Sequence, residues 1–303
     1  MAGVLRTIIP SPVFTGRGRR KEIVISIPSR QPEDREFSFS DADFRFLAEL
    51  VNARTGIVLA AHKKDMVYSR LARRLRALNL GSFSEYCELV RDEVAGADEM
   101  GNLVNAITTN LTNFFREGHH FDHLREKVLS PMAQGHDKRL RIWSAGCSSG
   151  MEPYSIAMTV KGAIRDLKSW DARILATDID TNMLNTGMSG RYVSDQADNI
   201  PVTYRHDMTQ HGSHIEVSDA LKNLITFKPL NLLEWWPMKG PFDVVFCRNV
   251  VIYFDKPTQE KLFNRVADLL KPEGWLYIGH SENLFKVCDR FELVGRTIYR
   301  KVR

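Results

Sequence analysis

The segment 139–155, RLRIWSAGCSSGMEPYS, constrains the fold of this chain more than any other stretch. Its residues 140–143 predict a short buried strand. Small residues follow at 145–150, where the backbone can turn sharply and a ligand can approach it closely. Glu152 and Pro153 then open a helix, because a proline in the first turn needs no amide donor. A strand, a small-residue turn and a helix N-terminus together predict the first half of a nucleotide-type binding crossover.

The bulk composition is that of a soluble protein with room for two domains. The chain has 303 residues, of which 43% are hydrophobic and 26% charged, and each of two domains can bury its own core. It contains no run of about 18 apolar residues, so no membrane insertion is expected. The four cysteines lie far apart, which indicates free thiols in a reducing cytoplasm and predicts no metal site. A net charge of +5 favours an acidic partner, although a scattered basic surface remains the alternative.

A small all-helical domain is expected over residues 38–109, after a flexible, proline-containing tail over residues 1–37. Ser40, followed three residues later by Asp43, makes a helix start. A second amphipathic helix is predicted over residues 63–78. Further amphipathic segments follow within the same region, so the helical domain is predicted to have several short helices.

The polar side of the second helix is strongly basic. Four arginines fall within seven residues and no acid separates them: Arg70, Arg73, Arg74 and Arg76. This pattern predicts a surface that docks an acidic helix or a polyanion, and a merely solvated face is the alternative. No outward aromatic residues accompany the arginines, as a platform for single-stranded nucleic acid requires.

Residues 110–124 are predicted to be an ordered linker that contributes to the ligand site. Asn110, Thr112 and Arg116 lie at nearly alternating positions, so their side chains can point together at a ligand. A plain domain connection with polar capping residues is the alternative.

The remainder, 125–303, alternates strand and helix patterns and predicts an α/β fold with a mostly parallel sheet covered on both faces. The second strand ends at Asp178, and the chain closes with an antiparallel hairpin over 291–301. The alternation is interrupted at about 189–226. Short β-like pieces there, around Tyr192, Tyr204 and residues 214–217, predict an insertion with a small antiparallel sheet.

The small-residue turn lacks residues that two classes of nucleotide-like ligand need, the triphosphates and the dinucleotides. A triphosphate loop needs a lysine after its last glycine, but Gly150 is followed by Met151 and Glu152. A dinucleotide site needs a third glycine and an acid about 20 residues on, whereas Asp178 comes much later. S-adenosylmethionine fits better, because it has no phosphate, its positive charges suit Glu152, and its ribose can donate to Asp178. Each acid also has a structural alternative, at a helix N-terminus or as a helix cap.

The strand at 242–247 ends at a third candidate region. Ligands bind outside the carboxyl ends of parallel strands, so Arg248 and Asn249 should border the cofactor. Tyr253 is placed to line the reacting centre, with a half-buried packing role as the alternative. Methyltransferases acting on nucleobase amines often carry a Pro-Pro-aromatic motif here, and its absence argues against a nucleic-acid substrate.

Five stretches of this chain resemble the chemotaxis receptor methyltransferases of the CheR family: TTNLTNFFRE (108–117), WSAGCSSGMEPYS (143–155), ATDID (176–180), LNLLE (230–234) and FCRNVVIYFD (246–255). The resemblance implies an S-adenosylmethionine-dependent, Rossmann-like methyltransferase domain with a small β insertion, preceded by a small all-helical domain. It implies these cofactor-binding residues: Asn110, Thr112, Arg116, Gly146, Glu152, Asp178, Asn231, Leu232, Arg248 and Asn249. It also implies that Arg116 and Tyr253 are catalytic and lie nearest the transferred methyl group.

The activity implied by the resemblance is methyl transfer from S-adenosylmethionine to glutamate side chains of chemotaxis receptors. The products are glutamyl methyl esters and S-adenosylhomocysteine, and the arginine-rich helix would read the acidic methylation helices of the receptors. Family members recruited by a receptor C-terminal pentapeptide carry a Gly-x-Gly loop, but the comparable stretch 207–213 has one glycine, so dependence on a pentapeptide is not expected. The alternatives are a receptor-binding adaptor with a vestigial cofactor site and a nucleic-acid methyltransferase.

Overall fold

A computed structural model describes residues 35–108 and 110–303 of the chain. The tail predicted over residues 1–37 lies almost wholly outside this described part. Phe37 is already buried in the core of the helical domain, so the packed structure begins there. In the described part of the chain, no helix combines the length and the apolar character that a membrane span requires.

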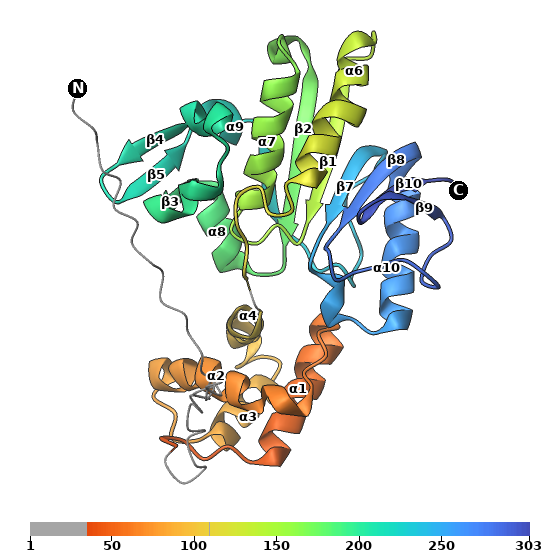
Figure 1. Ribbon diagram of the computed structural model, residues 1–303. Coiled ribbons are helices and arrows are strands. Elements are labelled where there is room, and N and C mark those ends of the chain that lie inside the picture. Colours follow the sequence, from red (N-terminus) through yellow and green to blue (C-terminus); the bar gives the residue numbers. More distant parts are fainter. Residues whose placement is uncertain (1–34, 109) are drawn as a thin grey trace, which may run out of the picture. The chain divides into compact units, whose positions relative to one another are not determined.

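The predicted all-helical domain is present at the start of the described chain (Figure 1). Ser40 begins the first helix, because its side chain accepts the amide of Asp43 while the Asp43 carboxylate accepts the amide of Ser40. That helix ends at Gly56, whose φ of 72° is a left-handed conformation that glycine adopts at little cost. The helices are α1 (Asp41–Thr55), α2 (Lys64–Leu78), α3 (Phe83–Arg91) and α4 (Ala97–Ile107).

A helical segment that was not predicted follows the linker. It consists of α5 (His119–His123), a π-helical stretch (Leu124–Leu129) and α6 (Ser130–Gln134). Phe121, Leu124 and Val128 are buried from this segment against the sheet. The linker expected over 110–124 is therefore irregular only as far as Gly118.

The predicted α/β domain is built on a mostly parallel sheet. Within the described residues seven strands pair in the order β6-β2-β1-β7-β8-β10-β9. The first five are parallel to one another, and the last two form the predicted antiparallel hairpin. The strands are β1 (Arg139–Ala145), β2 (Asp171–Asp178), β6 (Ile225–Pro229), β7 (Phe242–Cys247), β8 (Leu270–Ile278), β9 (Phe291–Gly295) and β10 (Ile298–Lys301).

Helices cover both faces of this sheet, as predicted. On one face α7 (Met151–Ala163) and the segment from α5 to α6 pack against β1 and β7 through residues such as Ile142 and Phe246. On the other face α10 (Lys256–Leu269) packs against the same strands through Trp143 and Val245. Between β2 and the insertion lies α8 (Thr181–Ser189). Strand β1, buried on both sides, therefore lies at the centre of the domain.

The insertion holds the small antiparallel sheet that was predicted, in the order β3-β5-β4. Its strands are β3 (Arg191–Val193), β4 (Met208–His211) and β5 (His214–Val217), followed by α9 (Asp219–Lys222). The interpretation of Tyr204 as part of a β-like piece is wrong. It lies in a 3-10 helix (Val202–Asp207), and its ring stacks on Phe115 with centroids 5.2 Å apart. Strand β6 of the main sheet begins at Ile225, close to the expected end of the insertion at about residue 226.

Candidate functional site

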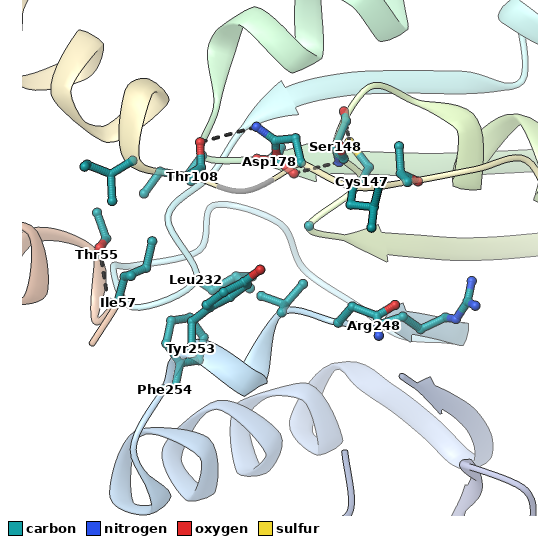
Figure 2. A pocket seen from close by; sticks show the side chains of 18 of the residues that line it. Thr55, Ile57, Thr108, Cys147, Ser148, Asp178, Leu232, Arg248, Tyr253 and Phe254 are labelled. Carbon is teal, nitrogen blue, oxygen red and sulfur yellow. Dashed lines mark hydrogen bonds between the residues drawn. The ribbon is translucent and has the colours of Figure 1, made fainter. Parts of the chain in front are cut away.

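A cavity lies at the carboxyl ends of β1, β2 and β7. The order of the strands reverses between β1 and β7, and open α/β sheets bind ligands at such a switch point. Figure 2 shows side chains from the helical domain, such as Thr55, and from the strand ends, such as Asp178, lining this cavity. The structure brings together at this cavity all the residues predicted to bind cofactor or to be catalytic: Asn110, Thr112, Arg116, Gly146, Glu152, Asp178, Asn231, Leu232, Arg248, Asn249 and Tyr253.

The turn after β1 is tightly closed on its own backbone. The amides of Gly146 and Cys147 both donate to the carbonyl of Thr177, at 2.8 and 2.9 Å, and the amide of Gly150 donates to the carbonyl of Cys147 at 3.1 Å. Gly146 has a φ of 75°, and a Cβ atom there would lie 2.3 Å from Val250. Because these amides already have partners, the turn is poorly suited to hold a phosphate, which needs several free amide donors.

Asp178 joins the ends of β2 and β1. Its Oδ2 accepts the amide of Ser148 at 2.7 Å, and its Oδ1 accepts the amide of Asp180 at 2.9 Å. Burial raises the pKa of Asp178 to about 6, although these amides oppose the shift. A carboxylate has about four acceptor positions, so Asp178 can accept further hydrogen bonds from a ligand diol.

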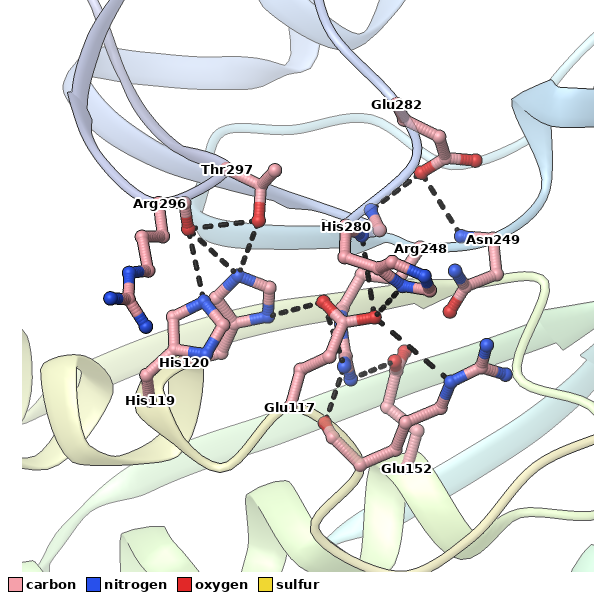
Figure 3. Close-up of polar contacts among 12 residues, drawn as sticks. Glu117, His119, His120, Glu152, Arg248, Asn249, His280, Glu282, Arg296 and Thr297 are labelled. Atoms are coloured by element: carbon pink, nitrogen blue, oxygen red, sulfur yellow. Dashed lines mark hydrogen bonds and ion pairs between the residues drawn. The ribbon is translucent and has the colours of Figure 1, made fainter. Parts of the chain in front are cut away.

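Arg248, which lines the cavity, lies between two carboxylates (Figure 3). Its Nη1 donates to Glu152 at 2.9 Å, and the other oxygen of Glu152 accepts the hydroxyl of Ser144 at 2.7 Å. Its Nη2 donates to the carbonyl of Arg116 and lies 3.5 Å from Glu117. Burial raises the pKa of Glu152, whereas its contacts with Arg248 and Ser144 oppose the rise.

Glu117 is a functional-site residue that the sequence analysis did not single out. Its Oε1 accepts from Nδ1 of His280 at 3.1 Å (Figure 3). Burial disfavours its charge, but Arg248 and His280 together hold the pKa of Glu117 below its usual value. Burial lowers the pKa of His120 to about 3, so this neighbouring imidazole is neutral. Ligand atoms of Glu117, His119 and His120 lie within 4.8 Å of one another, but the adjacent Arg248 guanidinium disfavours a metal cation there.

Glu282 is a second residue that was not predicted. Its buried carboxylate accepts the amides of Asn249 and Val251, both at 3.0 Å, and the amide of Gly279 at 2.5 Å. Asn249 has a φ of 58°, a left-handed conformation that this clamp holds. Burial raises the pKa of Glu282, and the amides that it accepts oppose the rise. Glu282 therefore fixes the loop that carries Arg248, Asn249 and Tyr253.

The helical domain closes one side of the cavity. The amide of Val58, just after α1, donates to the carbonyl of Tyr253 at 3.0 Å. Nδ2 of Asn231, in the loop after β6, donates to the carbonyl of Arg54 at 2.7 Å. The ammonium group of Lys63 lies 5.5 Å from the centre of the Tyr253 ring, within the range of a cation–π contact. These contacts tie the end of α1 to two loops at the carboxyl edge of the sheet.

The linker is held by polar contacts to the loop after β2 and by a contact within the linker itself. Nδ2 of Asn110 and the hydroxyl of Thr108 donate to Asp180, at 2.7 and 2.9 Å. Nη1 of Arg116 donates to the carbonyl of Leu111 at 2.7 Å. Asn110 and Arg116 therefore reach the cavity from an ordered linker, although both side chains also have partners within the chain.

Comparison with known proteins assigns both domains. Residues 42–108 match the family model described as "CheR methyltransferase, all-alpha domain", and residues 110–300 match "CheR methyltransferase, SAM binding domain". The chain therefore belongs to the CheR methyltransferase family. It is 44% identical over 259 residues to a probable chemotaxis protein methyltransferase of Rhizobium etli, covering 83% of this chain and 96% of that one. It is 43% identical to the chemotaxis protein methyltransferase of Escherichia coli (86% and 91% covered) and 42% identical to chemotaxis protein methyltransferase 2 of Pseudomonas aeruginosa (90% and 98%).

As a CheR methyltransferase the protein uses S-adenosylmethionine as its methyl donor. The site fits this cofactor chemically. The amides of Gly146, Cys147, Ser148 and Gly150 already have partners, which is compatible with a ligand that lacks a phosphate, and Asp178 retains acceptor positions for a ribose diol. Nε of Arg248 is buried without a hydrogen-bond partner among the described residues, so the guanidinium of this cavity-lining residue keeps one unused donor.

The four arginines of α2 in this CheR methyltransferase differ in their contacts and exposure, although the sequence pattern treats them alike. Arg74 forms two hydrogen bonds to the buried Glu99, at 2.9 and 2.6 Å. Nη1 of Arg70 donates to the carbonyls of Ile107 and Thr108 at the end of α4, at 2.6 and 2.9 Å. Both arginines thus have structural roles inside the domain that were not predicted. The exposed members of the set are Arg73 and Arg76.

Proposed function

We propose that this protein methylates glutamate side chains of chemotaxis receptors in the cytoplasm, as part of sensory adaptation. The observation that carries the proposal is the cationic lining of the cavity by Lys63 and Arg116, of which Lys63 lies beside the Tyr253 ring. Such a site favours a carboxylate substrate. A glutamate with a pKa of about 4.3 is ionised near neutral pH, so the reaction needs no general base. In keeping with this, the described residues that line the cavity include no histidine.

The cofactor is held, in this proposal, by the residues that line the cavity at the strand ends. Asp178 accepts the ribose hydroxyls, and Arg248 with its partner Glu152 binds the charged amino-acid end. The other contacts come from Asn110, Thr112, Arg116, Gly146, Asn231, Leu232 and Asn249. When bound, S-adenosylmethionine supplies an electrophilic methyl group on its sulfonium, and S-adenosylhomocysteine is the product.

Arg116 and Tyr253 are the proposed catalytic residues. Arg116 orients a carboxylate, of the substrate or of the cofactor, and Tyr253 shapes the site of methyl transfer. Catalysis then rests on alignment and on exclusion of water rather than on proton transfer. Arg116→Ala should lower turnover at saturating cofactor and receptor. Full turnover of this variant would contradict the role.

The proposed partners are the acidic methylation helices of the receptors, which dock on the basic helix α2 through Arg73 and Arg76. The β4–β5 turn contains one glycine, Gly212, so we propose that recruitment does not depend on a receptor C-terminal pentapeptide. Deleting the last five residues of a receptor should leave its methylation rate unchanged. We propose neither a nucleic-acid partner nor insertion into the membrane.

The test of this function is incubation of the protein with methyl-labelled S-adenosylmethionine and a purified receptor cytoplasmic fragment. Label that is released by mild base as methanol, and that is absent when the receptor glutamates are replaced by alanine, supports the proposal. Binding of the receptor without any binding of S-adenosylmethionine would instead indicate an adaptor with a vestigial site.

A further inference from the structure

The backbone around Arg116 adopts an uncommon conformation. Phe115 and Glu117, on either side of it, both have left-handed φ angles, of 51° and 58°. Such angles are rare for bulky residues and persist only where surrounding contacts hold them, which is often at functional sites. The conformation directs two adjacent charged side chains to different places. Arg116 lines the cavity, whereas Glu117 does not.

Glu117 does not line the cavity and lies among charged and polar groups. Its carboxylate is 3.5 Å from Nη2 of Arg248 and 4.0 Å from Nε of Arg116, and it accepts from the amide of His280 at 3.3 Å. Its Oε2 has no hydrogen-bond partner among the described residues. Its principal cationic neighbour is therefore Arg248, whose side chain is itself only 2% exposed.

We propose that Glu117 is a positioning residue of the methyl-donor site and acts through Arg248. Arg248 has Glu152 on one guanidinium nitrogen and Glu117 near the other, so two carboxylates from distant parts of the chain fix the plane of its guanidinium. Without Glu117, Nη2 of Arg248 would keep only the carbonyl of Arg116 as a partner, and the side chain could shift toward Glu152. Removing the Glu117 carboxylate would also leave the buried positive charge of Arg248, near Arg116, with one carboxylate fewer to balance it.

This inference rests on the proposed function, because it assigns the cavity at Arg248 to the methyl donor. It is tested by calorimetric titration of S-adenosylhomocysteine into the full chain and by KM and kcat for receptor methylation. Glu117→Gln should weaken binding about tenfold or more, as the loss of residues that orient metal ligands weakens metal binding. It should raise KM for the donor more than it lowers kcat. Glu117→Asp, which keeps the charge, should restore part of the affinity. Glu126→Gln, at an exposed ion pair with Arg125, is the matched control.

A double variant separates positioning from general stability. In Arg248→Lys the compact ammonium group cannot contact both acids as the guanidinium fork does. Adding Glu117→Gln to this variant should cause little further loss of affinity, measured at a temperature at which each variant is folded by circular dichroism. Equal affinity of Glu117→Gln and wild type, or losses that multiply in the double variant, would overturn the inference. Failure of the wild type itself to bind S-adenosylhomocysteine would contradict the proposed function instead.

Discussion

The carboxylate of Asp178 at the end of β2 accepts the backbone amide of Ser148, in the turn after β1, at 2.7 Å. This bond links the two strand ends that border the cavity, and it places a buried acid where a ribose diol would bind. Because burial raises the pKa of Asp178 to about 6, its ionisation and ligand binding are coupled.

The affinity for S-adenosylhomocysteine should therefore depend on pH through Asp178. Ribose hydroxyls donate to the ionised carboxylate, so binding tightens as pH rises toward about 6 and levels off above it, by at most about tenfold per pH unit. Without ligand, the stability that this group contributes falls as pH rises from about 4 to about 6, because only the folded chain still holds the proton. Calorimetry from pH 5 to pH 8 measures the effect. An unchanged profile in Asp178→Asn would show that another group is responsible.

Gly146→Ala should destabilise the protein and impair cofactor binding. The position has a φ of 75°, and the new Cβ would lie 2.3 Å from Val250, so an unfolding free energy lower by about 2 kcal/mol is expected. The matched control is Gly101→Ala on the exposed side of α4, where a Cβ meets no atom within 4 Å. That change should be neutral or slightly stabilising. Urea unfolding of both variants measures the difference, and equal stabilities would contradict the role of the turn.

Glu282→Gln should loosen the loop that carries Arg248 and Tyr253. The glutamine NH₂ group would face backbone amides that now donate to a carboxylate, which should cost about 2 kcal/mol of unfolding free energy. Cofactor affinity should fall with it. The control is Glu273→Gln, at an exposed ion pair with Arg300, which should change neither quantity. Wild-type stability and affinity for Glu282→Gln would refute the clamp.

The arginines of α2 should divide into two groups. Reversing the charge of Arg73 should slow receptor methylation severalfold and leave stability unchanged, because its side chain is exposed. Arg74→Met should instead lower the free energy of unfolding by about 2 kcal/mol, because it leaves the buried Glu99 without its cationic partner. Thermal unfolding and initial rates of methylation distinguish the groups. Equal effects of all these variants on stability would contradict the division.

Features that depend on residues close together in the sequence could be predicted from it. The capping pair of Ser40 and Asp43 sets the start of α1, and the small residues after β1 set the turn. Strand β6 was missed because an edge strand buries little, and in Ile225–Pro229 only Ile225 is buried. The helical segment at 119–134 was missed although the spacing of Phe121, Leu124 and Val128 could have indicated it.

Residues that act across long separations could not be predicted from local pattern. Glu117 and Glu282 reach Arg248 and Asn249 only after the linker and the loop following β8 meet at the sheet edge. The partner of Arg74 is likewise 25 positions away on another helix. The pattern of charge along one helix does not show which of its arginines bind partners inside the domain. The number of arginines available for docking was therefore overestimated.

The most direct test of the account is to map methylation sites by mass spectrometry, with trideuteromethyl S-adenosylmethionine and a receptor cytoplasmic fragment. The account predicts base-labile deuterated methyl esters on glutamate side chains of the receptor, formed by the wild type and strongly reduced with Arg116→Ala. Base-stable methyl groups on lysine or arginine, or no receptor methylation by a protein that binds the cofactor, would contradict it.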